Sequence, residues 1–589
     1  MDGRDKKLRL LGGTALAVAT VATRLPIHAK TFFEFDSINF AVAAIRFNLG
    51  EVTPHMPGYI LHVLFGRLLY LLTCDLNLAY IWVSILLSIG AVLFLWRAAA
   101  ALRGERVGII AALLWLTTPL FWFHGAVAAI YAEEAFFSSL LLYLGIKVIA
   151  NCELRIIGDR LGIRNDNEQP HSSFVIRHLS FVIYFITFSL AGAARPTSLL
   201  FFLPAAIFLI WKQKPSRLLL SAAMACFVAV TALWIFELLR ESGGSSTYWS
   251  YFIAENNFKT QSILFGNSWQ SQFDTLSKCA FYLPLSMGAG TIALVGIMAC
   301  FPRRVFAFSR AHLGNVKLHF IVLLALPALL FYAFIFFMKA AYLLNVVPSA
   351  ILIVAVLLDQ AAIWIAERQK GRLKNKKRLT RPIITRNVAV LTGIVIVLNV
   401  VWFFVPWPGT EQNIYDNEDT RNSFIHGALH RYEHSESRML TLANRALEYT
   451  NVSGIRAVDS LNTMTMSALL ANGANHSGEV ILASWWYRWC YLLLPNATTY
   501  DLELDPVHPG SLWVGRSHEM KRVNLYDSVI RFHSSAPVLL LLRRDRPDFE
   551  QVASQVHLER LPLPEYLDIY KILDSTFVLK WGNRMFSRE

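Results

Sequence analysis

A short polar stretch near the N-terminus carries residues that could do chemistry. Residues 33–59, FEFDSINFAVAAIRFNLGEVTPHMPGY, contain Glu34, Asp36, Asn39, Arg46, Glu51 and His55. A positioned carboxylate can take the proton from an attacking hydroxyl. Nearby cations can neutralise a departing phosphate, where one preorganised group is worth roughly 3–4 kcal/mol of the barrier. These residue types are the parts needed to displace a sugar from a lipid phosphate.

The composition around this stretch is that of a helical membrane protein. The chain has 589 residues, of which 55% are hydrophobic and 16% charged, and its mean hydropathy is +0.43. Apolar runs of membrane-spanning length recur up to about residue 405. In a membrane protein, the net charge of +14 is interpreted through the loops in which the Lys and Arg residues lie. We expect no nucleic-acid partner. The six cysteines lack C-x-x-C spacing and predict neither a disulfide framework nor a metal site.

The expected membrane spans place the polar stretch in the first outer loop. A basic N-terminus and an apolar segment at 10–22 indicate an uncleaved first helix, with a cleaved signal peptide as the alternative. Ten further candidate spans follow at 78–96, 107–123, 135–149, 179–194, 198–211, 218–236, 280–301, 318–338, 342–366 and 387–405. Counting 57–72 as a span would move the loops rich in Lys and Arg to the outside, against the positive-inside rule. We therefore expect about eleven spans, a cytoplasmic N-terminus, and a first outer loop at 24–77 in which 57–72 is re-entrant or interfacial.

The first outer loop is predicted to begin with an interfacial helix. Apolar residues recur three and four positions apart and form one helical face: Phe35, Ile38, Val42, Ile45 and Leu49. Asp36, Asn39 and Arg46 fall toward the other face. This pattern is typical of a helix that lies in the membrane surface.

A different kind of sequence follows the last span. Residues 406–589 mix strand-like runs at 455–460, 479–485, 536–544 and 576–581 with amphipathic stretches such as 435–449. This pattern predicts an α/β domain on the outer side, after a membrane domain at 1–405. Trp485, Trp486, Tyr487 and Trp489 could stack on a sugar, although packing inside the domain is the simpler interpretation.

Four more polar stretches reach the outer face, at 124–134, 192–198, 240–278 and 339–348. The spans that they join have interiors almost free of Asp, Glu, Lys and Arg. Coupled transporters and flippases usually keep ionisable groups or broken helices near the midplane. The charges instead converge at one lipid–water boundary, which favours chemistry on a lipid head group.

At these residues the sequence resembles the GT-C superfamily of membrane glycosyltransferases. That group includes protein O-mannosyltransferases, aminoarabinose transferases and the catalytic subunit of oligosaccharyltransferase. The resemblance covers about 8–405 and is carried by FDSINF, PHMPGY, IYAEEAFF, ARPTSLLFFLP and AAYLLNVVP. It is closest to a bacterial branch of protein-mannosyltransferase-like proteins, which suggests a bacterial plasma membrane.

The resemblance implies an inverting transfer from a polyprenyl-phosphate sugar to a hydroxyl of a protein or glycan. It implies a base in the first outer loop, at Asp36, although the acidic pair is spread as Glu34-x-Asp36 and Glu34 stays an alternative. It also implies that substrate is bound by His55, Tyr59, Tyr131, Glu134, Arg195, Lys339 and Tyr342. Some members of the superfamily need a divalent metal, and no metal ligand is assigned here.

Simpler interpretations remain open for the main candidates. Asp36 could cap the interfacial helix, because Asp is favoured at that position. Arg195 and Lys339 could be anchors at the membrane surface. An O-antigen ligase or polymerase is a further alternative, although that class leads us to expect a large loop between late spans.

Overall fold

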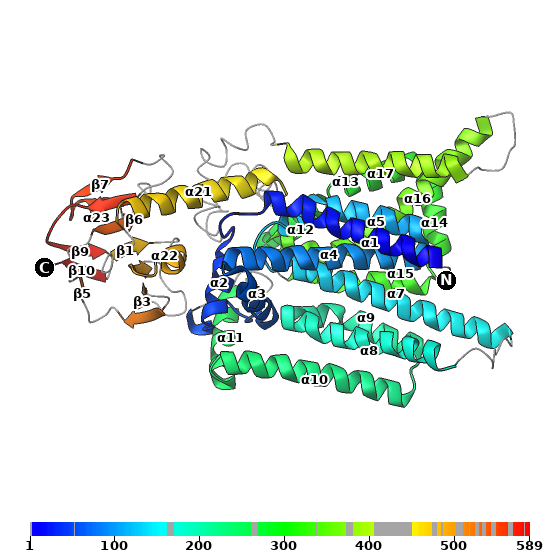
Figure 1. Cartoon of the computed structure of the whole chain (residues 1–589), viewed down its shortest axis with the longest axis horizontal. Coiled ribbons are helices and arrows are strands. Elements are labelled where there is room, and N and C mark those ends of the chain that lie inside the picture. Colours follow the sequence, from blue (N-terminus) through cyan, green and yellow to red (C-terminus); the bar gives the residue numbers. More distant parts are fainter. Residues whose placement is uncertain are drawn as a thin grey trace.

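The computed structural model shows a long bundle of helices with two small sheets at one end (Figure 1). It describes residues 3–405 apart from 52, 162–169, 261–268, 336–338 and 373–380. It also describes 450–588 apart from 474–479, 484–486, 502–510, 517–518, 525–528, 533–536, 543–548, 563–568 and 582–583. The amphipathic stretch predicted at 435–449 lies outside the described residues, as do Trp485 and Trp486.

Long apolar helices make up the bundle. They are α1 (Gly3–Arg24), α4 (Leu76–Arg103), α5 (Glu105–Thr117), α7 (Tyr131–Leu161), α8 (Pro170–Ala194), α9 (Thr197–Gln213), α10 (Arg217–Glu241), α12 (Trp269–Ser286), α13 (Ala289–Cys300), α15 (Val316–Phe334), α16 (Val347–Arg372) and α17 (Arg381–Phe404). Shorter elements connect them: η1 (Leu25–Ile27), α2 (Phe35–Ile45), η2 (Leu49–Glu51), α3 (Ile60–Thr73), α6 (Pro119–His124), α11 (Ser245–Thr260), α14 (Pro302–His312) and η3 (Ala340–Asn345).

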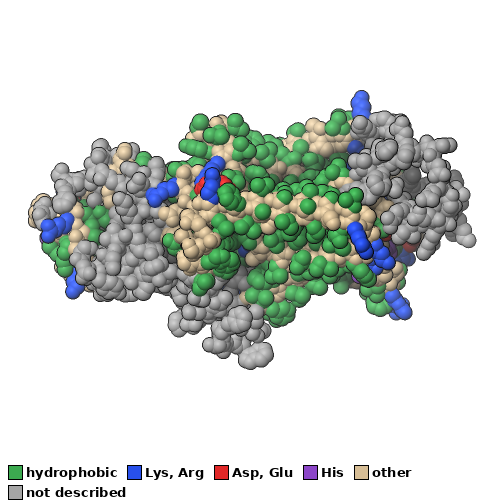
Figure 2. All heavy atoms as spheres, turned by 90° about the horizontal axis from the view of Figure 1, so that it is seen from below, with side chains coloured by type: hydrophobic (Ala, Val, Ile, Leu, Met, Phe, Trp, Pro, Cys, Tyr) green, Lys and Arg blue, Asp and Glu red, His purple; other side chains and the backbone are tan. Residues whose placement is uncertain are grey.

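The bundle is that of an integral membrane protein. Seven helices in the described part of the chain are long and apolar enough to cross a bilayer, or eight when the bent pair α12–α13 counts as one span. Three further candidates, α5, the apolar part of α8, and α9, are shorter, so the expected count of eleven stays a prediction. Hydrophobic side chains cover the middle of the face in Figure 2, and Lys and Arg lie toward both ends of this band.

Three predicted spans are broken. The span expected at 107–123 is divided, because Pro119 disfavours a helical conformation at the residue before it, so that α5 ends and α6 begins. The span expected at 280–301 bends by 94° between α12 and α13. The span expected at 342–366 starts as the 3₁₀ helix η3 and becomes α-helical only from Val347.

The first outer loop contains the two predicted short helices. α3 has 14 residues and so spans about 21 Å, short of the ~30 Å hydrocarbon core. Figure 1 shows α2 and α3 together at the end of the bundle that faces the sheets. Asn39, which the pattern places on the face of α2 opposite the apolar one, is fully buried. The reason is that α3, α4 and the C-terminal helix α22 (Tyr487–Leu493) all pack on α2.

The C-terminal part is a small α/β unit, as predicted. Its strands are β1 (Val480–Ala483), β2 (Thr498–Asp501), β3 (Ser511–Arg516), β4 (Glu519–Asn524), β5 (Ile530–Phe532), β6 (Val538–Leu541), β7 (Leu558–Arg560), β8 (Ile569–Ile572), β9 (Phe577–Trp581) and β10 (Arg584–Arg588). Seven of them form a sheet in the order β4-β3-β2-β1-β6-β8-β7, and the other three form a sheet in the order β5-β10-β9. β1 is parallel to β2 and β6, with Val480 opposite Thr498 and Val538. Helices α21 (Val452–Ala471) and α23 (Phe549–Ala553) complete the unit.

The strand expected at 455–460 is wrong, because these residues lie inside α21. The run IRAVDS continues into LNTMTMSALLA, and the side chain of Asn451 caps the helix by accepting from the backbone N–H of Ser453. The six residues were interpreted as a strand-like run, but the helix extends over twenty. The prediction failed because the short window hid the longer helical period.

Candidate active site

The start of α2 holds the two acidic residues of the opening motif. Glu34 is the N-cap of α2, and its backbone N–H donates to Ser37 Oγ at 3.4 Å. The idea that Asp36 caps the helix is therefore wrong, because Asp36 lies two positions further on, in the first turn of α2, where its charge favours the helix N-terminus. The side chains of Glu34 and Asp36 both line the cavity described below.

Lys339 joins the two carboxylates. It lies directly before η3, and its Nζ donates to Glu34 Oε2 at 2.7 Å and to Asp36 Oδ2 at 3.2 Å. The two acids differ in exposure: 6% of the Glu34 side chain is accessible, against 31% of the Asp36 side chain. Burial raises the pKa of Glu34, and the charge of Lys339 opposes that rise.

The PHMPGY motif forms the wall beside Asp36. His55 Nδ1 lies 3.6 Å from Asp36 Oδ1, and its ring packs on Phe40 and Tyr59, with centroids 5.6 and 4.9 Å away. Gly58 has a φ of +103°, and a Cβ there would lie 2.5 Å from the Leu238 side chain. Only glycine fits this turn, which directs Tyr59 toward the cavity. Burial raises the pKa of the Tyr59 hydroxyl, so it stays protonated and can donate a hydrogen bond.

A second acid–cation pair faces the first across the cavity. Arg195, between α8 and α9, pairs through Nη1 with Glu134 Oε1 in the first turn of α7. The Arg195 guanidinium also lies over the Tyr342 ring, 4.4 Å from its centroid. Tyr342 in turn stacks on Tyr332 at 5.7 Å. These contacts hold the guanidinium in one orientation.

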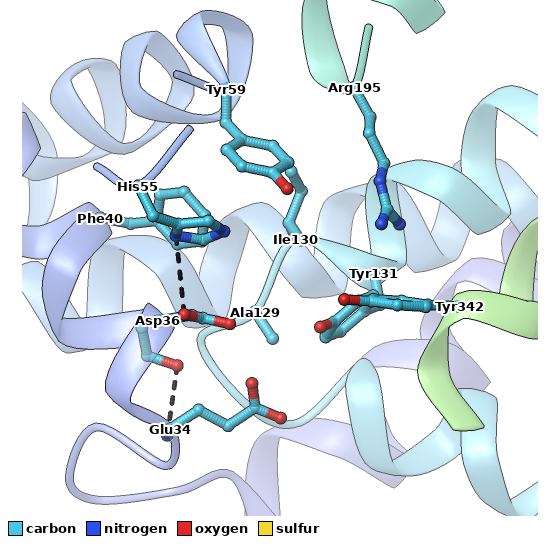
Figure 3. A pocket seen from close by; sticks show the side chains of 11 residues that line it. Glu34, Asp36, Phe40, His55, Tyr59, Ala129, Ile130, Tyr131, Arg195 and Tyr342 are labelled. Carbon is cyan, nitrogen blue, oxygen red and sulfur yellow. Dashed lines mark hydrogen bonds and ion pairs between the residues drawn. The ribbon is translucent and has the colours of Figure 1, made fainter. Parts of the chain in front are cut away.

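A cavity lies between these groups (Figure 3). It is lined by Glu34, Asp36, Ser37, Phe40, His55, Tyr59, Ala129, Ile130, Tyr131, Arg195 and Tyr342. Figure 3 shows the carboxylates on one side and Arg195, Tyr131 and Tyr342 on the other. The polar groups from both sides converge on this one space, as they do in small-molecule sites.

The structure brings most of the predicted site residues together. Asp36, Glu34, His55, Tyr59, Tyr131, Arg195 and Tyr342 line the cavity, while Lys339 and Glu134 act on it through their ion pairs. Sequence reasoning missed Phe40 and Ser37, although Phe40 lies four residues after Asp36 and therefore on the same helical face. It also missed the buried contact between His62 Nδ1 and Glu133 Oε1, 3.0 Å apart behind α2, for which no motif gave a signal.

Part of the chain matches a known protein family. Residues 36–219 match the family described as the N-terminal domain of protein O-mannosyl-transferase TMEM260. The matched segment contains six of the candidate residues: Asp36, His55, Tyr59, Tyr131, Glu134 and Arg195. No curated protein matches the sequence.

The whole chain has the fold of a known membrane enzyme. It is similar to ArnT from Cupriavidus metallidurans bound to undecaprenyl phosphate, with 12% identity and a TM-score of 0.51, over 97% of this chain and 98% of that one. The apo state of the same protein gives 12% identity and a TM-score of 0.46, over 95% of this chain and 97% of that one. The archaeal oligosaccharyltransferase AglB from Archaeoglobus fulgidus was solved in complex with an inhibitory peptide and a dolichol-phosphate. It has 12% identity and a TM-score of 0.43, over 83% of this chain and 64% of that one.

The fold is therefore of the GT-C type, and the resemblance seen in the sequence motifs is confirmed. The family match covers the first outer loop from Asp36 onward and the helices up to the start of α10, which include much of the cavity wall.

Proposed function

We propose that the protein transfers a sugar from a polyprenyl-phosphate donor to an acceptor hydroxyl, with inversion, and that Asp36 is the general base. The observation that carries this proposal is the contrast in exposure among the acids of the site. Asp36 has 31% of its side chain accessible, while Glu34 has 6%, Glu134 has 1% and Glu133 has none. Asp36 is thus the one of these four carboxylates that a substrate hydroxyl can readily reach.

The geometry supports a single displacement. The acceptor hydroxyl lies beside Asp36 and gives up its proton to the carboxylate as its oxygen bonds to the anomeric carbon. The bond between that carbon and the donor phosphate breaks on the opposite face, so the configuration inverts. Polyprenyl phosphate leaves as an anion. Arg195, across the cavity from Asp36, is placed to stabilise it, and Lys339 does so after it releases the Asp36 carboxylate.

The donor class is supported by the surroundings of the site. The cavity lies at the end of the apolar bundle, where a lipid-linked phosphate would present itself (Figure 1). ArnT, which shares the fold, was crystallised with undecaprenyl phosphate. We infer that the first outer loop and the C-terminal unit lie on the extracytoplasmic face of a bacterial plasma membrane. In this arrangement residues 1–405 form the catalytic membrane domain, and 406–589 form the outer domain.

Lys339 takes the place that a divalent metal would need. The carboxylates of Glu34 and Asp36 both accept from its ammonium group, which lies between them. Among the residues that the structure describes, no three or more His, Cys, Asp and Glu side chains are arranged around a common point. The proposed mechanism uses the Lys339 charge.

The test compares Asp36→Asn with Glu34→Gln. The first change keeps the size of the side chain but removes the base, and a positioned base is worth about 10²–10⁴-fold in rate. We expect Asp36→Asn to lower transfer by at least about 10²-fold, with binding of the donor and the melting temperature close to those of the parent. We expect Glu34→Gln to lose much less, because Glu34 is buried against Lys339.

The assay is transfer in detergent from polyprenyl-phosphate mannose to a peptide rich in serine and threonine, repeated with other polyprenyl-phosphate sugars. Near-normal transfer by Asp36→Asn would remove Asp36 from the mechanism. An inactive Glu34→Gln protein beside an active Asp36→Asn protein would move the role of base to Glu34.

A further inference from the structure

The segment that leads into the catalytic helix is held by the C-terminal unit. Residues 28–34 connect η1 to α2 without regular structure. The Asp459 side chain of α21 accepts from the backbone N–H of Lys30 through Oδ2 at 2.8 Å and from that of Thr31 through Oδ1 at 2.8 Å. The Thr31 hydroxyl also donates to Oδ1 at 2.9 Å. One carboxylate therefore fixes two consecutive peptide groups more than 400 positions away in the sequence.

A second residue of α21, Asn462, also binds this segment, and we call the hydrogen bonds of Asp459 and Asn462 to residues 30–32 the clasp. Asn462, which follows Asp459 by three positions and so lies on the same helical face, donates through Nδ2 to Thr31 Oγ1 at 2.8 Å and to the Phe32 carbonyl at 3.0 Å. Asn462 is buried. In α22, the Trp489 ring lies 6.3 Å from the Phe35 ring at the first turn of α2. The C-terminal unit thus contacts the catalytic segment on both sides of Glu34.

The membrane bundle holds the same segment from the other direction. The Ala29 backbone N–H donates to the Ala126 carbonyl at 2.9 Å, and Asn77 Nδ2 donates to the Ala29 carbonyl at 3.0 Å. The Phe33 ring packs edge-on against Phe123, with centroids 4.9 Å apart. The path of the chain from residue 29 to Asp36 is therefore set jointly by the bundle and by α21.

We propose that Asp459 and Asn462 are positioning residues for the transfer reaction: α21 fixes residues 30–32 and thereby sets the place of Asp36 in the cavity. This inference rests on the function proposed above. It gives the C-terminal unit a part in catalysis that does not depend on binding the acceptor. A shift of about 1 Å in a catalytic group can cost about 10²-fold in rate, so loss of the clasp acts on turnover even though α21 does not line the cavity.

The first test removes either all of the hydrogen bonds between Asp459 and residues 30–31 or only the one made by the Thr31 hydroxyl. Asp459→Ala deletes all three hydrogen bonds, and we expect kcat to fall about 10- to 100-fold. Thr31→Ala leaves both backbone bonds and deletes only the hydroxyl, so we expect a fall of about 3- to 10-fold. Thr31→Ser keeps the hydroxyl and should restore kcat to the parent value. Binding of polyprenyl phosphate should be unchanged in all three variants, because the cations of the site lie on other elements.

Two further measurements separate positioning from folding and from the proposed function. Hydrogen exchange of the amides in 29–37 should be faster in Asp459→Ala, with exchange in α4 unchanged, and this readout does not require transfer activity. Ser460→Ala, the exposed neighbour on α21, is the matched control and should behave like the parent in every assay.

The other possible results also decide whether Asp459 and Asn462 position Asp36. Normal kcat in both Asp459→Ala and Thr31→Ala overturns it, and so does a Thr31→Ser protein that is as slow as Thr31→Ala. If Asp459→Ala does not fold, the Thr31 pair and Asn462→Ala decide in its place. If exchange responds as expected but Asp36→Asn transfers normally, the clasp stands and the proposed role of Asp36 fails.

Discussion

The two walls of the cavity carry the same chemical groups in different surroundings. On the first wall, Lys339 binds Glu34 and Asp36. The accessible fraction of the side chain is 23% for Lys339 and 31% for Asp36, but only 6% for Glu34. On the second wall, Arg195 binds Glu134, and only 10% and 1% of these side chains are accessible. Arg195 is also stacked on Tyr342, whereas Lys339 holds its partners through a single ammonium group.

This difference suggests a division of labour. A buried ion pair is costly to break, because the partner left behind keeps an uncompensated charge. A partly exposed pair is worth little by itself and can exchange partners with a substrate. We therefore interpret the Arg195 wall as fixed and the Lys339 wall as the one that rearranges when the donor phosphate enters.

The largest expected effect comes from breaking the fixed wall. Arg195→Ala should lower the free energy of unfolding by about 3–5 kcal/mol, because Glu134 stays buried without its partner. It should also lower transfer by about 10²-fold, since a preorganised group that stabilises charge is lost. Thermal melting in detergent and the transfer assay measure the two effects.

Two controls test the cause of that loss. Arg304→Ala breaks an exposed pair with Glu367 and should cost at most about 1 kcal/mol. In Arg195→Ala/Glu134→Gln, the second change removes the buried charge, so melting should recover while transfer stays low. Recovery of both would show that Arg195 acts only through folding, and recovery of neither would contradict the buried-charge account.

The second prediction concerns the wall that rearranges. Lys339→Ala should lower donor use by about 10-fold and lower the melting temperature less than Arg195→Ala does, because one of its two partners, Asp36, is partly exposed and the buried Glu34 can take up a proton. The KM for the polyprenyl-phosphate sugar and the melting curve are the two measurements. A melting change as large as that of Arg195→Ala would remove the distinction between the walls.

The site was largely predictable from the sequence, and the reason is visible in its residues. Asp36, His55, Tyr59 and Arg195 lie in short motifs that carry the resemblance to the GT-C superfamily, and the expected spans place these motifs on one face of the membrane. The partnership of Lys339 with Glu34 could not be predicted, because it joins positions more than 300 residues apart, and Lys339 was expected to meet a phosphate instead.

The helical bundle could be predicted from the sequence, whereas the contacts of the C-terminal unit could not. Long apolar runs specify membrane helices one at a time. The burial of Asn39 and the contacts of Asp459 depend on how the outer unit packs on α2 and on residues 30–32, and no local period records that packing. The run 455–460 shows the limit at short range, since six residues fit a strand while their neighbours made them part of α21.

The third prediction uses the raised pKa of Glu34. Its pKa in the folded protein lies above the ordinary value of 4.5 because burial disfavours the carboxylate, although Lys339 opposes this. The stability that comes from the protonated form is complete below about 4.5 and is lost as the pH rises through the raised pKa. Glu34→Gln stays neutral, so its melting temperature should rise relative to the parent between pH 4 and pH 7. The opposite trend would mean that the pair with Lys339 outweighs burial.

The smallest expected effect is that of His55, and it tests how far the open wall extends. Its Nδ1 lies 3.6 Å from Asp36 Oδ1, beyond the usual range of a strong hydrogen bond, and 18% of its side chain is accessible. A partly solvated contact of this kind is worth about 0.5 kcal/mol, which corresponds to roughly a 2-fold change in rate. His55→Phe keeps a ring against Phe40 and Tyr59 while removing both nitrogens, so transfer should fall only about 2- to 3-fold and melting should be unchanged. His55→Ala also loses the packing and should melt earlier at a similar transfer rate per folded molecule. A loss of 10²-fold in His55→Phe would place the imidazole among the reacting groups, and the open wall would then hold two proton carriers instead of one.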